Sequence, residues 1–378
     1  MKPSILFEIA LCLFLLPAQV LGAETESNKD QPESNPKPPA VLTPISDILA
    51  LNARMRSMID LFVKPIDYKD RRAQELYRLM FDADKFALQY DNSYTKTAIE
   101  TVETGSGNCV SLANAFVAMA RYAGLNARFL NVRVPDNWQR ESDVYYKLTH
   151  ISASVKVSVT DYLAIEYQWM GTLNRAKKEI ISDEQAFGSF YSNRGIELLM
   201  NDNFDAAIEH LQYAVKLDPD SAHNWSNLGT AYRRMNKLDE AEQAYKRALK
   251  EDRDDPTALN NLAFLYQLRG ETKLAAKYNK RLERYHLKNP YYLIKLAKDE
   301  MQKGDFDKAL RYTRKAIRKR DDEHEFYFVA AKIYAHMGKT EKAMENLELA
   351  EKYAMNARNR NLYARKLELL KGIEHRKK

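Results

Sequence analysis

The sequence predicts an α+β domain followed by an all-α array of helical repeats. Residues 45–183 show helical spacing of apolar side chains first and strand-like alternation afterwards, which is typical of an α+β domain. From residue 188 onward the sequence repeats itself every 34 residues, a period typical of stacked helical hairpins. A chain of 378 residues, 45% of them hydrophobic, is long enough to form more than one packed domain.

The N-terminus has the features of a targeting segment. A positively charged start is followed by an apolar run at residues 9–17, too short to span a bilayer, and then by small and polar residues. We expect a signal peptide over residues 1–23, cut after Gly22 or Ala23. The mature protein is then exported, periplasmic or secreted, with no transmembrane segment. An uncleaved membrane anchor is the alternative.

Two further segments flank the predicted domains. Residues 24–44 are polar, proline-rich and without periodicity, which indicates a disordered linker. Residues 358–378 carry six of the seven net positive charges of the chain, behind an amphipathic stretch at 360–372 that could cap the repeats. Because the rest of the chain is nearly neutral, we expect no nucleic-acid partner and interpret the basic tail as solvated.

The α+β domain is assigned to residues 45–183. Its apolar spacing predicts helices within 45–90 and a further helix that starts near Cys109 and ends at Gly124. Alternation of apolar and polar residues predicts three strands, at 127–133, 151–159 and 162–169.

This domain contains a single cysteine, Cys109, and a single histidine, His150. Two such ligands do not fill the tetrahedral shell of zinc, so neither a metal site nor a cofactor is predicted. They are sufficient for a thiol nucleophile, because imidazole can take the thiol proton and return it. Cys109 follows a glycine turn at a helix start, where backbone N–H groups lower a thiol pKa and can cradle an oxyanion. The alternative is a buried structural cysteine and an uninvolved strand histidine.

A carboxylate could orient the imidazole of His150. Glu166 lies on the next predicted strand, across a hairpin, where it could fix the tautomer of the ring. Asp161 is the alternative acid, ranked second because it is predicted to lie in the turn.

Several short segments within residues 92–170 resemble the transglutaminase-like cysteine enzymes. They are Gly107-Asn108-Cys109, the helix end Ala120–Gly124 with the following Leu125–Arg128, and Thr149-His150 leading into a strand. The resemblance implies a papain-like α+β fold, a Cys–His–Asp triad and acyl chemistry, as in a cysteine protease or amidase or in a transglutaminase-type acyltransferase.

The sequence departs from that family pattern at three places. Glu166 stands where aspartate is usual, residues 151–154 lack the aromatic residue often found after the histidine, and the hairpin turn lacks glycine and tryptophan.

The 34-residue units start at residues 188, 222, 256, 290 and 324, without an insertion. Small or apolar residues recur at the eighth, twentieth and twenty-seventh positions, where two antiparallel helices would cross closely, and turn-type residues recur at the fifteenth. Period and pattern resemble the tetratricopeptide repeat, which implies a superhelix of five such repeats over residues 184–357.

The repeat resemblance also implies a concave surface that binds a protein or peptide. Asn193, Asn227 and Asn261 occupy the sixth position of the first three units, where an amide can donate to and accept from an extended backbone. Arg233 and Arg234 could meet an acidic side chain or a terminal carboxylate. Alternatively, the asparagines bridge neighbouring helices and the arginines are solvated.

Two functional hypotheses follow. In the first, the protein is an exported thiol enzyme with Cys109 as nucleophile, His150 as base and Glu166 as orienting acid, and its repeats recruit a protein or peptide. In the second, the α+β domain is catalytically inactive and serves as a platform, while the repeats scaffold an envelope protein complex.

Overall fold

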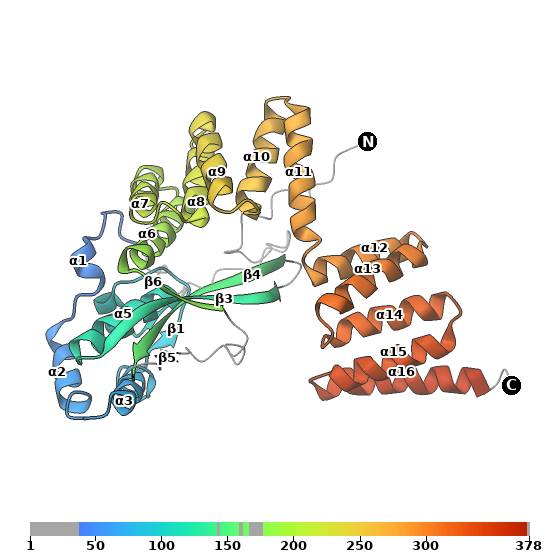
Figure 1. Cartoon of the computed structure of the whole chain (residues 1–378), viewed down its shortest axis with the longest axis horizontal. Helices are drawn as coiled ribbons and strands as arrows, with labels where there is room; N and C mark the ends of the chain where they lie inside the picture. Colours follow the sequence, from blue (N-terminus) through green and yellow to red (C-terminus); the bar gives the residue numbers. More distant parts are fainter. Residues whose placement is uncertain (1–37, 142–143, 159–161, 166–176, 376–378) are drawn as a thin grey trace, which may run out of the picture. The chain divides into compact units, whose positions relative to one another are not determined.

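A computed structural model describes residues 38–141, 144–158, 162–165 and 177–375. The predicted signal peptide and most of the predicted linker therefore lie outside the described residues. The chain divides into two compact units, Met1–Pro135 with Thr149–Asn279, and Asp136–Leu148 with Lys280–Lys378. Each unit is described by itself below, and the elements carry the labels of Figure 1.

The N-terminal part is α+β, as predicted. Its helices are α1 (Ile45–Ile48), α2 (Ala53–Phe62), α3 (Lys69–Phe81), α4 (Ala98–Thr104) and α5 (Cys109–Tyr122). Its strands are β1 (Gln89–Tyr90), β2 (Ser106–Gly107), β3 (Asn126–Glu141), β4 (Val144–Lys156), β5 (Tyr162–Ile165) and β6 (Lys177–Ile181). The last four strands form a sheet in the order β5-β4-β3-β6, and β1 pairs with β2 in parallel. The alternation rule missed β6, since four of its five residues are exposed.

Helix α5 is the centre of the hydrophobic core. Eleven of its fourteen residues are buried, because its sequence is apolar on all sides. It shares this core with α2 and α3 and with inward-facing residues of two strands, Phe129 on β3 and Val155 on β4. The helix ends where Gly124 adopts a φ of +78°, a left-handed conformation that glycine takes without steric cost.

The first repeat helix, α6 (Asp183–Met200), belongs to the same core. Only Ser182 separates it from the end of β6, and the Ser182 side chain caps it by accepting from the backbone N–H of Gln185. Phe187, Phe190 and Tyr191 of α6 are buried in the cluster that contains α5. A boundary after residue 183 therefore cuts through a hydrophobic core, and no linker separates the domain from the first repeat.

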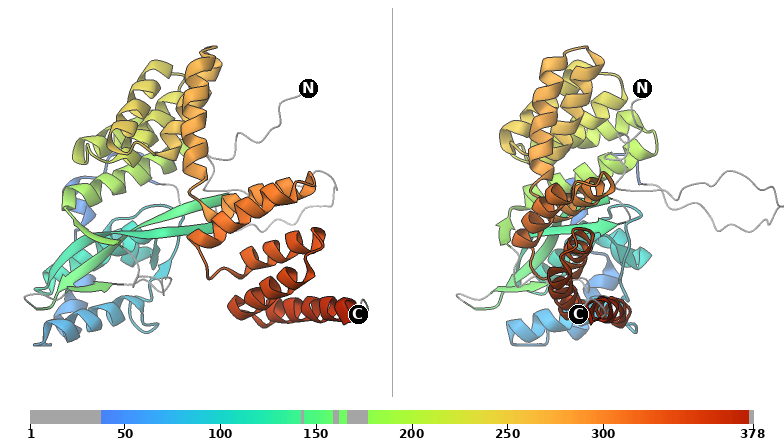
Figure 2. Two further views of the ribbon diagram at one scale, coloured as in Figure 1. Left: turned by 45° about the vertical axis from the view of Figure 1, so that its right-hand side comes forward. Right: turned by 90° about the vertical axis from the view of Figure 1, so that its right-hand side faces the viewer.

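The repeats form helical hairpins at the predicted spacing (Figures 1 and 2). After α6 come α7 (Phe204–Leu217), α8 (Ala222–Arg234), α9 (Leu238–Glu251), α10 (Pro256–Leu268), α11 (Thr272–His286), α12 (Pro290–Gln302), α13 (Phe306–Lys319), α14 (His324–His336) and α15 (Thr340–Tyr353). A final helix, α16 (Ala357–His375), buries Tyr363 and Leu367 in a cluster that includes Leu347 of α15.

The predicted positional pattern of the repeats is confirmed in both units. The fifteenth residue of every repeat has a positive φ: Asp202 (59°), Asn236 (59°), Gly270 (75°), Gly304 (80°) and Gly338 (71°). At the eighth position, a Cβ on Gly229 would lie 2.7 Å from the ring of Tyr245, and one on Gly195 would lie 2.5 Å from Leu211. The small residues are therefore required by close helix crossing.

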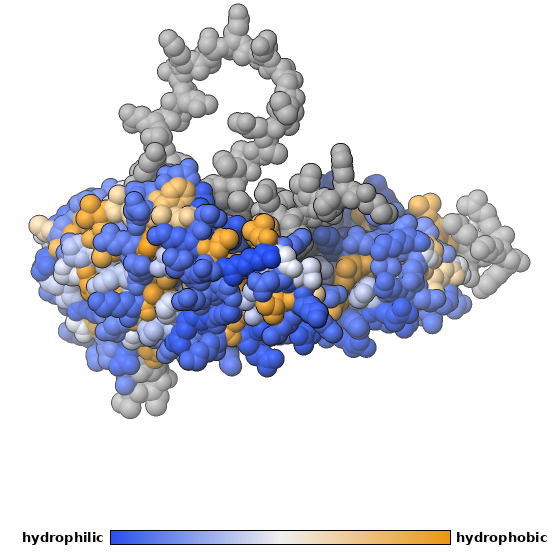
Figure 3. Space-filling view, turned by 90° about the horizontal axis from the view of Figure 1, so that it is seen from above, coloured by the Kyte–Doolittle hydropathy of each residue, from blue (hydrophilic) through white to orange (hydrophobic). Residues whose placement is uncertain are grey.

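The surface of the molecule is mainly polar on the face drawn in Figure 3, where apolar side chains are scattered among hydrophilic ones. Among the helices that the structure describes, none combines the length and apolar character needed to cross a membrane.

Candidate functional site

Asn108 is the N-cap residue of α5. The Asn108 Oδ1 accepts hydrogen bonds from the backbone N–H of Ser111 at 3.0 Å and from its hydroxyl at 2.9 Å. Gly107 precedes the cap because a Cβ there would lie 2.5 Å from the Cβ of Ser111. The turn before Cys109 therefore leaves no room for a side chain, and the cap fixes where the helix begins.

The thiol of Cys109 meets β4 at the peptide bond that joins His150 to Ile151. Burial raises the pKa of the Cys109 thiol, and hydrogen bonds from the backbone of Ile151, Val110 and Cys109 itself act in the opposite direction. The backbone N–H groups at the helix start act on the thiol pKa in the expected direction, but burial has the larger effect and the pKa is raised. A thiol in this environment keeps its proton at neutral pH unless a base takes it.

The structure describes only a small part of the other two residues of the predicted triad. The backbone of His150 lies in β4, but its side chain is outside the described part of the chain. Glu166 and Asp161 are outside it altogether. Strand β5 pairs antiparallel with β4, with Ile165 opposite Ala153. The last described residue of β5 is thus the one immediately before Glu166. The triad remains a prediction.

Sequence reasoning missed a polar cluster that lies behind Asn108. It contains Thr95, Arg194 and Glu197, and the last two belong to the first repeat helix. A signal was present in the sequence. Arg194 aligns with Leu228 of the second repeat at a spacing of 34 residues, and Glu197 aligns with Ala231, so two charged residues stand where the next repeat is apolar.

The three predicted peptide-binding asparagines differ in their environments. Asn193 is half-buried. Asn227 is 9% exposed, donates to the Ser192 hydroxyl at 3.0 Å and lies 3.1 Å from the His223 Nε2, while Asn261 is 3% exposed and donates to the Thr257 carbonyl at 3.0 Å. The contact of Asn227 with α6 matches the alternative interpretation, in which the amide bridges neighbouring helices.

The two arginines of α8 also have partners within the chain. Arg234 donates to the Leu199 carbonyl at 2.7 Å and to the Asp202 carboxylate at 2.9 Å, so it joins the second repeat to the turn of the first. The Arg233 guanidinium lies 5.7 Å from the ring centroid of Phe264 on α10. Neither arrangement includes an external carboxylate, and a ligand role for the two residues stays a prediction.

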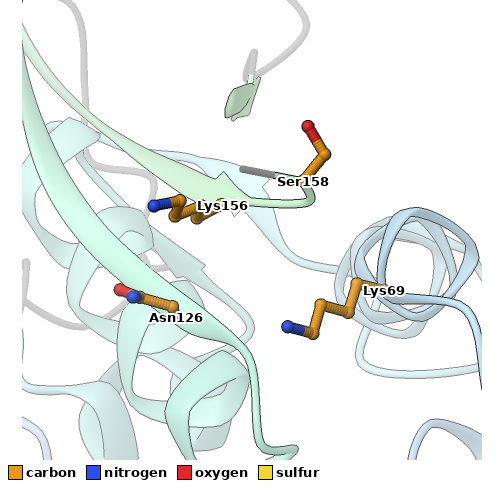
Figure 4. A pocket seen from close by; sticks show the side chains of 4 residues that line it. All are labelled: Lys69, Asn126, Lys156 and Ser158. Carbon is orange, nitrogen blue, oxygen red and sulfur yellow. The ribbon is translucent and has the colours of Figure 1, made fainter. Parts of the chain in front are cut away.

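A separate cavity of about 430 Å³ is lined by Lys69, Asn126, Lys156 and Ser158 (Figure 4). Cys109, whose side chain the structure describes, does not line it. Within the described ranges, no three His, Cys, Asp or Glu side chains gather closely enough to hold a metal ion.

Comparison with protein families identifies both parts of the chain. Residues 60–171 match the transglutaminase-like superfamily. Residues 198–263 and 294–356 match tetratricopeptide repeats. The protein therefore contains a transglutaminase-like domain followed by tetratricopeptide repeats, an architecture that joins this domain to protein-interaction modules.

Solved structures resemble this chain over less than half of its length. A structure from a study of Pseudomonas aeruginosa PilF is 18% identical, covering 47% of this chain and 82% of its own, with a TM-score of 0.27. YrrB, described as a TPR protein with an unusual peptide-binding site, is 21% identical over 47% of this chain and 91% of its own, with a TM-score of 0.25. MamA is 20% identical over 44% and 91%, with a TM-score of 0.26. No curated protein matches the chain.

Proposed function

We propose that this protein is an exported thiol enzyme of the transglutaminase-like type. Cys109 is the nucleophile, His150 takes and returns its proton, and Glu166 orients the imidazole. One observation supports the assignment above all others: the Cys109 thiol lies at the peptide bond between His150 and Ile151, beside the backbone of the proposed base.

The proposed chemistry follows from these residues. The thiolate adds to the carbonyl carbon of an amide or ester, the leaving group departs with the proton held by His150, and a thioester to Cys109 remains. Attack by water releases an acid, and attack by an amine releases a new amide. The repeats present a protein or peptide to this site, periplasmic or secreted as the leader sequence predicts.

The pKa of the Cys109 thiol gives a direct test. Burial raises this pKa and outweighs the backbone hydrogen bonds. An apparent pKa below the usual value of about 8.5 therefore requires an ion pair with a neighbouring cation. The rate of alkylation by iodoacetamide, measured from pH 5 to pH 10, reports this value. We expect an apparent pKa below about 8.5 in the wild type and above it in His150→Ala, where burial acts without the imidazole.

The Cys109→Ala variant is the matched control, because it removes only this thiol and keeps every other reactive group of the mature chain. If the wild type and His150→Ala label with the same pH profile, the thiol and the imidazole do not form a pair and the enzyme proposal is wrong.

A second function is favoured by the raised thiol pKa itself. A half-buried, protonated Cys109 suits an inactive transglutaminase-like platform whose repeats scaffold an envelope protein complex. The same labelling series separates the two proposals. If Cys109 labels more slowly than a free thiol at every pH, the platform is supported; if it labels through the low-pKa form, the enzyme is.

A further inference from the structure

The first repeat carries a buried arginine, ion-paired to the half-buried Glu100 of α4, where the second repeat has a leucine. Arg194 is 0% exposed, donates to the Glu100 carboxylate of α4 at 2.7 Å and lies over the ring of Tyr94 at 5.1 Å. The equivalent residue of the second repeat is Leu228, which is 4% exposed. A buried charge is retained only where partners compensate its lost hydration, so this helix is adapted to the domain that it packs against.

Glu197 lies one turn further along α6 and binds the segment in front of α4. Its Oε1 accepts from the backbone N–H of Thr95 at 2.8 Å and from the Thr95 hydroxyl at 2.7 Å. Its Oε2 is buried and has no hydrogen-bond donor among the residues that the structure describes.

Thr95 connects Glu197 to Asn108 at the candidate site. The Asn108 amide donates to the Thr95 hydroxyl at 2.8 Å, and the Asn108 Oδ1 holds the first turn of α5 through Ser111. Both Thr95 and Asn108 are buried, at 0% and 8% exposure. Because Glu197 accepts, the Thr95 hydroxyl must donate to it and is left to accept from Asn108, which in turn fixes which end of the Asn108 amide faces Ser111.

We propose that Glu197, on the first tetratricopeptide helix, is a positioning residue for the Cys109 site, acting through Thr95 and Asn108 on the start of α5. The inference rests on the proposed function only in assigning that site to Cys109. It makes the repeat array part of the site's construction, because a displacement of α6 would change the hydrogen bonds that set the Asn108 cap.

The charge of Glu197 adds a pH dependence to this arrangement. Burial raises its pKa to about 7, while the Thr95 hydrogen bonds and the charge of Arg194 oppose the shift and Glu100 adds to it. The ring of Tyr94 also faces this charge, and His210 of α7 faces Arg194. A neutral carboxyl is a weaker acceptor than a carboxylate, so the two hydrogen bonds from Thr95 to Glu197 weaken as the pH falls through 7.

Amide hydrogen exchange in the first turn of α5 tests the proposal on the full chain without any substrate. Glu197→Ala removes the acceptor, and we expect exchange at Ser111 and Leu112 to rise by up to about tenfold, the equivalent of one hydrogen bond. Glu197→Gln keeps an acceptor oxygen but cannot titrate. It should show faster exchange than the wild type above pH 7, because an amide is a weaker acceptor than a carboxylate, and no added change near pH 7, whereas the wild type should loosen below pH 7.

Glu184→Gln is the matched control, since Glu184 is an exposed residue of the same helix. If Glu197→Ala does not fold, Thr95→Val breaks the chain of hydrogen bonds without removing a charge and should give the same local increase. The proposal is overturned if these variants lower the melting temperature but leave exchange in the first turn of α5, and its pH dependence, equal to the Glu184→Gln control.

The two proposals can fail separately. The exchange at Ser111 reports the Asn108 cap whether or not Cys109 reacts, and the effect of His150→Ala on alkylation reports the thiol whether or not Glu197 holds the cap. Alkylation of Cys109 in the Glu197 variants tests both proposals together. If these variants change the alkylation rate, and His150→Ala still shifts the pH profile of alkylation in them, both proposals are supported.

Discussion

Helices α6 and α8 occupy the same position in successive repeats, but they are adapted to different neighbours. Helix α8 buries Leu228 and Ala231 against other repeat helices, as a solenoid requires. Helix α6 has Arg194 and Glu197 at these two positions and directs them to α4 and to the segment before it. The difference shows that the first repeat serves as a component of the α+β domain as well as the first unit of the array.

The largest effect is expected from making α6 resemble α8. Arg194→Leu removes the ion-pair partner of Glu100 and a positive charge that acts on Glu197, and we expect a loss of about 3–5 kcal/mol in the free energy of unfolding. Urea denaturation followed by tryptophan fluorescence measures it. The double variant Arg194→Leu/Glu197→Gln should recover part of the loss, because Glu197 then carries no charge and only Glu100 is left without its partner. Equal losses in both variants would mean that the charges of α6 do not interact.

The next largest effect is expected in the pH dependence of stability, to which Glu197 of α6 contributes and the equivalent Ala231 of α8 does not. Glu197 has a pKa of about 7 in the folded protein, against 4.5 ordinarily. Between these values the unfolded chain has lost the proton that the folded protein keeps, so stability falls as the pH rises from 4.5 to 7 and changes no further above it.

Glu197→Gln lacks this slope, and its stability relative to the wild type should increase by up to about 3 kcal/mol between pH 4.5 and 8. Thermal unfolding of both proteins across this range measures the difference. Parallel curves would show that Glu197 has an ordinary pKa. The exposed residue Glu184 on the same helix provides the control, with Glu184→Gln expected to follow the wild type.

The crossing glycines give a smaller and more even effect. Gly229→Ala places a Cβ against the ring of the buried Tyr245, and Gly195→Ala places one against Leu211. We expect each to cost about 1–3 kcal/mol, with the larger loss for Gly229→Ala because an aromatic ring yields less than a leucine side chain. The midpoints of urea denaturation rank the two. A greater loss at Gly195 would mean that α6 is the more tightly packed of the two helices.

The smallest effect is expected in the turns. Asp202 and Asn236 both have a φ of 59°, in the left-handed region that the glycines at the same position of the later repeats also adopt. Asn236→Gly should stabilise the protein by a few tenths of a kcal/mol up to about 1, since glycine relieves the left-handed strain. Asp202→Gly should gain less or nothing, because Asp202 binds Arg234 at 2.9 Å. Differential scanning calorimetry of both variants compares their melting temperatures.

The repeats could be predicted almost completely from the sequence, because their constraints are local and periodic. The fifteenth position needed a residue that tolerates positive φ, and the eighth needed a small one, and both requirements are visible at a spacing of 34 residues. The same holds for α5, whose apolar spacing predicts a helix between Cys109 and Gly124. Strand β6 escaped prediction because its residues are largely exposed and carry no alternation.

The elements that carry Cys109 and His150 could be predicted from the sequence, but the electrostatics around the thiol could not. Cys109 at a helix start and His150 on a strand could be read from the chain, and the thiol does meet that strand. The pKa of the thiol depends on how much surrounding material excludes water, which sequence spacing does not contain. The contact between Glu197 and Thr95 joins residues 102 positions apart, so it follows from tertiary packing alone.

The single residue between β6 and α6 determines how this protein can be divided. A fragment that stops at residue 183 would leave the surface beneath Phe187, Phe190 and Tyr191 open to water and would aggregate or melt. Because Ala214 of α7 also belongs to that core, the shortest piece able to fold by itself must extend beyond Leu217, through a complete first hairpin. Any exchange of recognition modules by recombination would therefore have to take place after that hairpin.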